Sequence, residues 1–186
     1  MIADSTFYLV FLKDIDKPLY FKKIVDAHDF LLAPLVDSEI QHRLKKHNKS
    51  ANYAYIVNNN KITKFDNSKV NLGATIKYFF GPSQIKVGEH EVVGHAFHLL
   101  HTPNVDLCCI LDDKDARRIV KKRLLALYNI LKWTTDFIKD SCCVSGVLEK
   151  DECIQIFTDM KKVGSLKVSD ARYDRILNEI KSGQPV

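Results

Sequence analysis

The chain has 186 residues, of which 46% are hydrophobic and 27% charged, and such a composition is ordinary for a globular protein with one good core. Its longest apolar runs, such as Phe7–Leu12, fall far short of the ~20 residues that a membrane-spanning helix needs. The N-terminus also lacks the basic start and long apolar core of a signal peptide, which excludes the common export route and predicts a cytoplasmic location. The net charge of +5 is mild, so it suggests an acidic partner only where cations cluster.

The first part of the chain is predicted to form a hairpin followed by a helix. Thr6–Lys13 is continuously apolar, which is typical of a strand buried on both faces, and Leu19–Val25 is expected to be its partner strand. Helical spacing of apolar residues then predicts a helix over Asp26–Lys46. Pro34 should kink or split this helix near Ala33, because proline disrupts a helix interior.

Further short strands are predicted in the middle of the chain. Tyr53–Val57 and Lys61–Phe65 read as a second hairpin, because the three asparagines between them tolerate tight turns. Ala74–Phe80 looks like another strand. Glu89–His101 fits a strand or a short helix, and its β-branched pair and internal glycine favour a strand that pairs with Val105–Leu111.

A long helix over Asp112–Asp140 is the strongest predicted element. Neither Gly nor Pro interrupts it, Asp112 or Asp113 can cap its first N–H groups, and its apolar stripe needs a surface to cover. Two shorter helices, Leu148–Lys162 and Ser169–Lys181, are expected to follow it. The stripe consists of Val120, Leu124, Leu127, Leu131, Thr134 and Ile138.

These elements predict an α+β protein in which an antiparallel sheet of about five strands is packed between helices. Residues 1–140 would form this mixed domain, and residues 141–186 a helical C-terminal extension.

No catalytic or metal-binding motif is recognised. His90 and Glu91 suggest an HExxH zinc motif, but the next histidine is His95, five residues on, so the two rings would not face one metal. The five cysteines lack the spacing of zinc ligands, and the seven glycines form no phosphate-binding loop. We therefore expect no metal, no cofactor and no small-molecule substrate.

A thiolate–imidazole pair is the one nucleophilic arrangement that the sequence allows. It would join Cys108 or Cys109 to His95 or His98 on a neighbouring strand. Nothing around the thiols supplies an oxyanion hole, and a buried strand is the plainer interpretation of the two adjacent cysteines.

The candidate binding residues are five cations near the start of the predicted long helix. Cations in the first turns of a helix oppose its dipole unless an anion neutralises them. The pattern therefore predicts a site for an anionic partner, and phosphoinositides, RNA and an acidic protein surface all remain open. The five residues are Arg117, Arg118, Lys121, Lys122 and Arg123.

Two passages resemble the longin family, in particular the sedlin-like subunits of the TRAPP vesicle-tethering complex. Ser5–Val10 followed by Asp16–Phe21 is similar to the opening hairpin of those subunits. His95–Leu100, leading through Val105–Asp113 to Arg117 and Arg118, looks like the last hairpin and basic helix start of longin domains. The resemblance implies a five-stranded antiparallel sheet between helices and no catalytic residues.

The function expected from these features is that of a non-enzymatic adaptor that binds other proteins of a cytosolic assembly, as in vesicle tethering. The first alternative is a basic protein of viral matrix or accessory type that associates with RNA or an anionic membrane. The second is a cysteine hydrolase.

Overall fold

The computed structural model describes residues 1–67, 70–81, 87–103, 106–166 and 168–183. Its five strands form one sheet in the order β3-β2-β1-β4-β5, and all four neighbouring pairs are parallel. The predicted antiparallel sheet is therefore wrong, and the protein is of the α/β class. The strands are β1 (Ile2–Ala3), β2 (Phe30–Leu32), β3 (Ile62–Lys64), β4 (Cys109–Ile110) and β5 (Leu131–Lys132).

Helices connect every strand to the next, as parallel pairing requires. After β1 come α1 (Ser5–Leu9), a π-helix (Val10–Asp14) and α2 (Pro18–Asp26), and after β2 come α3 (Pro34–Lys46), a 3₁₀ helix (Ser50–Tyr53) and α4 (Ala54–Val57). After β3 come α5 (Leu72–Phe80) and α6 (Gly88–Leu100), after β4 come α7 (Lys114–Arg123) and α8 (Leu125–Asn129), and after β5 come α9 (Thr134–Cys143), α10 (Lys150–Lys162) and α11 (Asp170–Ser182).

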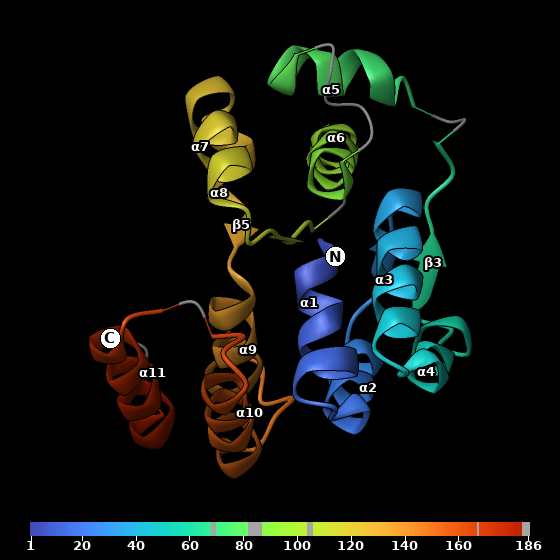
Figure 1. The fold of residues 1–186 in the computed structure, drawn as a ribbon. Coiled ribbons are helices and arrows are strands. Elements are labelled where there is room, and N and C mark those ends of the chain that lie inside the picture. Colours follow the sequence, from blue (N-terminus) through green and yellow to red (C-terminus); the bar gives the residue numbers. More distant parts are fainter. Residues whose placement is uncertain (68–69, 82–86, 104–105, 167, 184–186) are drawn as a thin grey trace.

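In Figure 1, one group of helices lies above the level of β5 and the others lie beside or below it. Helices α5, α6, α7 and α8 lie above that level, and we call them the cap helices. The remaining helices run alongside and below the sheet. Helix α6 contacts α3 and β1, so the cap helices are joined to the lower part of the molecule.

The two N-terminal runs predicted to be strands are helices. The Asp4 carboxylate caps α1 by accepting hydrogen bonds from the N–H groups of Thr6 (3.0 Å) and Phe7 (3.4 Å). Phe7–Leu12, which runs from α1 into the π-helix, is buried throughout, so it has the same continuous apolar character as a strand buried on both faces. Pro18 occupies the first turn of α2, where its missing N–H has no cost.

The prediction for the middle of the chain is right for β3 and wrong for three other strands. Tyr53–Val57, Ala74–Phe80 and Glu89–His101 are all helical. Gly94, taken as a strand signal, instead allows α5 and α6 to pack closely, because a Cβ there would lie 2.5 Å from the Leu72 side chain. In the predicted strand Val105–Leu111 only Cys109–Ile110 is a strand, and Val105 is outside the described residues.

The predicted long helix is divided into α7, α8, β5 and α9. Leu124 has extended backbone angles (φ −153°, ψ 96°) that end α7, and Leu131–Lys132 forms the edge strand of the sheet. Val120, Leu127, Leu131 and Ile138 are all buried, so the apolar stripe identified core residues correctly but assigned them to one element. The predicted helix over Asp26–Lys46 is right only from Pro34 onward, because Phe30–Leu32 is strand β2 and Pro34 is the first residue of α3 instead of a break within a helix.

The two C-terminal helices are confirmed as α10 and α11. Ser169 caps α11 by accepting a hydrogen bond from the N–H of Arg172, and Gly183 ends it with a positive φ of 69°. Phe157 of α10 and Ile180 of α11 are fully buried in the same hydrophobic core as the strands, so these two helices share the core of residues 1–140. Among the described residues, no helix combines the length and the apolar character needed to cross a bilayer.

Candidate functional site

Two aspartates meet where the central strands end. Asp4 follows β1 and Asp112 follows β4, two residues after the strand, and the two strands are neighbours in the sheet. The chain builds the sheet outward from β1 in one direction through β2 and β3, and on the other side through β4 and β5. In open α/β sheets, ligands bind beyond the carboxyl ends of the strands at this reversal of strand order.

Backbone hydrogen bonds hold both carboxylates in place. Asp4 Oδ1 accepts from the start of α1, and Oδ2 accepts from the N–H of Asp112 at 2.7 Å. Asp112 Oδ1 accepts from the N–H of Thr134, the first residue of α9, at 2.7 Å. The two carboxylates thereby tie together the ends of β1, β4 and β5.

The electrostatic environment of Asp4 is unusual for a carboxylate. Its side chain is only 4% exposed. Burial, followed by the negative charge of Asp112, raises the pKa of Asp4 to about 7 despite three backbone hydrogen bonds that lower it. A cation bound beside the two carboxylates would favour their charged forms and so lower the pKa of Asp4.

Beside Asp4, a second buried acidic side chain belongs to the same edge of the sheet. Glu91 of α6 is 1% exposed, and its Oε2 accepts from the N–H of Leu35 at 2.6 Å, just beyond the end of β2. Its Oε1 accepts from the side-chain amide of Asn67 at 3.0 Å. Glu91 thus joins a cap helix to the strand edge beside Asp4.

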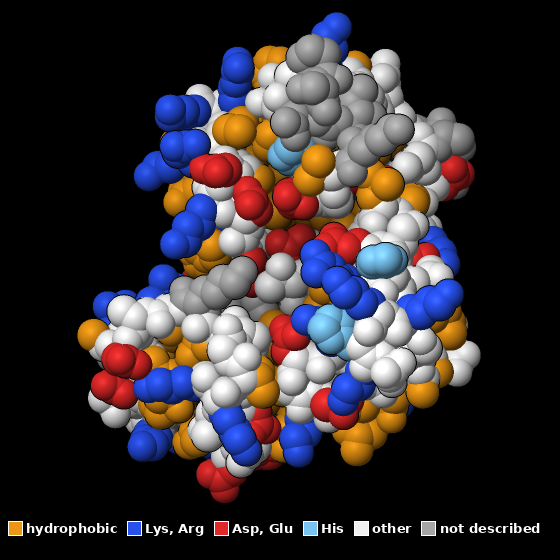
Figure 2. All heavy atoms as spheres, in the orientation of Figure 1, with side chains coloured by type: hydrophobic (Ala, Val, Ile, Leu, Met, Phe, Trp, Pro, Cys, Tyr) orange, Lys and Arg blue, Asp and Glu red, His pale blue; other side chains and the backbone are white. Residues whose placement is uncertain are grey.

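The space-filling view shows a hollow between the upper and the lower part of the molecule (Figure 2). Figure 2 shows acidic side chains inside and beside this hollow, with Lys and Arg side chains flanking it. A negative floor with positive surroundings suits a polyanion that binds through metal ions and direct cation contacts.

A cavity of about 280 Å³ adjoins Asp112. It lies between the ends of the strands and the segment that connects α10 to α11. Trp133, Met160 and Val168 form its apolar walls, and Lys114 and Arg172 contribute cations. Hydroxyl groups of Thr6, Thr135, Ser165 and Ser169 complete its lining.

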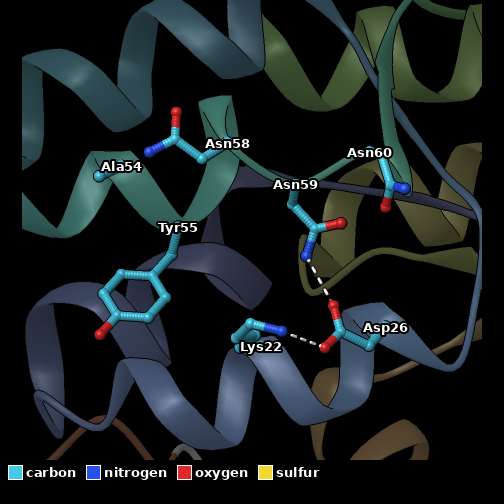
Figure 3. Close-up of a pocket in the computed structure, with 7 residues that line it drawn as sticks. All are labelled: Lys22, Asp26, Ala54, Tyr55, Asn58, Asn59 and Asn60. Carbon is cyan, nitrogen blue, oxygen red and sulfur yellow. Dashed lines mark hydrogen bonds and ion pairs between the residues drawn. The ribbon is translucent and has the colours of Figure 1, made fainter.

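A second cavity, of about 430 Å³, lies away from the acidic site between α2 and the turn after α4 (Figure 3). Asp26 accepts from the Lys22 ammonium and from Asn59 Nδ2 (3.0 Å), so the charged groups of this cavity already pair with each other. The acidic site is therefore the stronger candidate.

The five predicted anion-binding cations do not form one surface. Arg117 is buried, and its guanidinium donates to the carbonyl oxygens of Leu111 (3.1 Å) and Leu131 (3.2 Å) while packing 4.2 Å from the Trp133 ring. It joins the ends of β4 and β5 and cannot contact a partner. Arg118, Lys121, Lys122 and Arg123 are exposed.

The dipole argument for this cluster is wrong. Helix α7 ends at Arg123, so Lys121, Lys122 and Arg123 occupy its last turn, where cations are favourable. Arg118 forms an ion pair with Asp115 at 2.8 Å. Binding of an anionic partner by the exposed cations stays a prediction. It is no longer supported by an unfavourable interaction between these cations and the helix dipole.

The predicted pairing of Cys108 or Cys109 with a histidine required His95 and His98 to lie on a neighbouring strand. Both histidines lie on helix α6, so the structure does not provide that arrangement. His95 is fully buried, with its ring centroid 3.7 Å from that of Phe65. Burial raises the pKa of the Cys109 thiol, which disfavours the reactive thiolate.

Sequence reasoning missed Asp4 and assigned Asp112 to helix capping. The available signal was a short apolar segment that ends in an aspartate, which occurs at Ile2–Asp4 and again at Ile110–Asp112. Only the parallel pairing of β1 and β4 shows that the two aspartates are neighbours.

Within the described ranges, no group of three or more His, Cys, Asp or Glu side chains is arranged to hold a metal ion. A pair of carboxylates remains sufficient for Mg²⁺, which usually keeps several waters and takes further ligands from substrate phosphates.

The fold and this site define an α/β protein with a parallel sheet and an acidic centre at the point where the strand order reverses. Comparison with models of known families, with curated proteins and with solved structures found no match.

Proposed function

We propose that the protein is a divalent-metal-dependent phosphodiesterase that cleaves nucleic acid, with Asp4 and Asp112 holding the metal ion. The observation that carries the proposal is the position of Asp4 and Asp112 beyond the adjoining ends of β1 and β4, where Asp4 Oδ2 accepts a hydrogen bond from the backbone N–H of Asp112 at 2.7 Å. Such a pair repels an anionic substrate unless a cation lies between them.

The residues around the pair fit this chemistry. A bound Mg²⁺ or Mn²⁺ would polarise a phosphoryl oxygen and lower the pKa of a bound water. Hydrolysis of a phosphodiester there would add water to phosphorus and break the P–O bond to the leaving oxygen, yielding a phosphate monoester and an alcohol. The backbone N–H groups that bind Asp4 and Asp112 fix both carboxylates before the metal arrives.

A nucleic-acid substrate is supported by the charge around the hollow. Lys and Arg side chains flank the acidic floor (Figure 2), and the chain as a whole carries a net charge of +5. Phosphate contacts of this kind supply most of the sequence-independent affinity for nucleic acid. The exposed cations of α7 are part of this proposal, and so is a cytoplasmic location.

The test is cleavage of a labelled single-stranded oligonucleotide in Mg²⁺ or Mn²⁺ and in EDTA. We expect metal-dependent cleavage that falls roughly 100-fold or more in Asp4→Asn and in Asp112→Asn. Asp115→Asn is the matched control, because this aspartate of α7 has a side chain 77% exposed and should leave the rate unchanged. Calorimetric titration with Mn²⁺ provides a second readout, in which both site variants should lose binding. Full cleavage by both site variants would contradict the proposal.

The expected adaptor function remains a prediction, because no comparison bears on it. The described strands form a parallel sheet instead of the antiparallel one that the longin resemblance implied, so the geometry gives that function no support.

A further inference from the structure

We infer that the 280 Å³ cavity beside Asp112 binds one nucleotide unit of the substrate strand, so that the C-terminal helices α10 and α11 select where the strand is cut. This inference rests on the proposed phosphodiesterase function and adds a specificity site to it. The cavity shares Asp112 with the acidic centre, which places it directly next to the proposed point of cleavage.

The lining of the cavity suits the two parts of a nucleotide. Trp133 offers an aromatic surface, and Met160 and Val168 offer apolar contacts, for a base that has left the stack. Arg117 packs over the Trp133 ring at 4.2 Å and helps to fix its position. The hydroxyl groups of the lining can then hydrogen-bond to the sugar or the base edges.

The cations of the cavity suit a phosphate. Lys114 approaches from the first residue of α7, and Arg172 from the first turn of α11. Arg172 Nη2 pairs with Asp136 Oδ1 at 3.1 Å, which orients the guanidinium and leaves further N–H donors. Asp136 is not part of the cavity lining, so the pair positions Arg172 from outside.

The size of the cavity argues for a single unit. Its volume of about 280 Å³ is close to the lower end of the roughly 300–1,000 Å³ found for ligand pockets. It therefore fits one nucleotide and excludes a folded segment or a second base. The walls come both from residues near the strand ends and from the α10–α11 connection, so neither part forms the cavity alone.

Binding can be measured in the full chain without metal, because Trp133 is the only tryptophan and lines the cavity. We expect adenosine monophosphate in EDTA to change Trp133 fluorescence saturably, with adenosine and inorganic phosphate each binding at least about tenfold more weakly. Arg172→Gln should weaken mononucleotide binding about tenfold or more, because it removes a charge-assisted hydrogen bond.

The matched control is Asp136→Asn, which breaks the same ion pair but keeps the guanidinium, and its binding should stay within about threefold of wild type. Val168→Phe fills the cavity without changing its charge and should also abolish binding, so the inference does not depend on one variant.

Unchanged binding in both cavity variants, or phosphate binding as tightly as the mononucleotide, would overturn the inference. Metal-dependent cleavage without mononucleotide binding would overturn it while sparing the proposed function. Mononucleotide binding lost in the cavity variants, in a protein that cleaves nothing, would overturn the proposed function and leave the nucleotide site standing.

Discussion

Arg117 shows how a surface prediction fails at the scale of one residue. Five cations in seven positions suggest a solvated or ligand-binding face, yet Arg117 is directed inward to the carbonyl oxygens of Leu111 and Leu131. Burial lowers the pKa of its guanidinium, but arginine remains charged, and the ring of Trp133 offers it an aromatic surface.

We expect Arg117→Met to lower the free energy of unfolding by about 3 kcal/mol, because it leaves two buried carbonyl oxygens without a charged donor. Arg118→Met is the control. Its side chain is 67% exposed and its ion pair with Asp115 lies at the surface, so the change should be within about 0.5 kcal/mol. Urea denaturation of both variants measures the difference, and equal losses would show that Arg117 has no special structural role.

At the scale of elements, burial was easier to predict than secondary structure. The stripe from Val120 to Ile138 named core residues correctly, because spacing reports which side chains avoid water. It could not show that Leu124 is extended or that Leu131 belongs to a strand, because strands of two or three residues carry almost no periodicity.

The same limit explains the misassigned N-terminal strands. A helical segment buried along its length, such as Phe7–Leu12, and a strand in the centre of a sheet have the same apolar composition. Helices α10 and α11 were predicted correctly because each has one exposed polar face and clear end signals, such as the Ser169 cap. The candidate site could not be assembled from sequence, since Asp4 and Asp112 are brought together by strand pairing alone.

Leu127→Ala should lower the free energy of unfolding by about 2–5 kcal/mol, because Leu127 is fully buried and α8 cannot collapse into the space left. Leu125 lies in the same helix with 60% of its surface exposed, so Leu125→Ala is a control of identical chemistry and should change the free energy by less than about 0.5 kcal/mol. Chemical denaturation measures both. Similar losses would mean that α8 packs by a different face.

Helix α11 is attached to α9 through Glu179. Its Oε2 accepts from the Lys139 ammonium at 2.7 Å and its Oε1 from Arg175 Nε at 3.1 Å, while its side chain is only 3% exposed. The hydrogen bond from Lys139, followed by its charge and that of Arg175, holds the pKa of Glu179 below the ordinary value of 4.5.

Because the pKa of Glu179 is lower in the folded state than in the unfolded chain, its carboxylate stabilises the fold fully when the pH lies above the ordinary pKa of 4.5. This contribution is lost as the pH falls through the lower pKa of the folded state. Glu179→Gln should therefore cost about 2 kcal/mol at neutral pH and progressively less below pH 4.5. Denaturation across this range tests the sign. Asp170→Asn, whose aspartate is 86% exposed, should show no such convergence with wild type. A constant difference at every pH would exclude the ionised carboxylate as the cause.

At the scale of the whole molecule, residues 141–186 were expected to be a separate extension, yet their apolar side chains share the core of the sheet. Ile156 and Phe157 of α10 are fully buried, and Cys153 lies with its sulfur 3.7 Å from the carbonyl oxygen of Ile138 in α9. Lys23 of α2 also binds Glu152 of α10 at 2.7 Å. The helices therefore stabilise the same unit that carries the acidic site.

Unfolding of the full chain should accordingly be one cooperative transition. Trp133 reports on the junction between β5 and α9, and far-UV circular dichroism reports on all helices, so the two midpoints in denaturant should coincide. A chain cut after Gly146 loses the fully buried apolar side chains of α10 and α11, such as Ile156, Phe157 and Ile180, each contributing about 1.5–3 kcal/mol. Because native domains are stable by only about 5–15 kcal/mol, we expect the shortened chain to lack a cooperative transition. A shortened chain that unfolds cooperatively with the midpoint of the full chain would show instead that residues 141–186 are an independent extension.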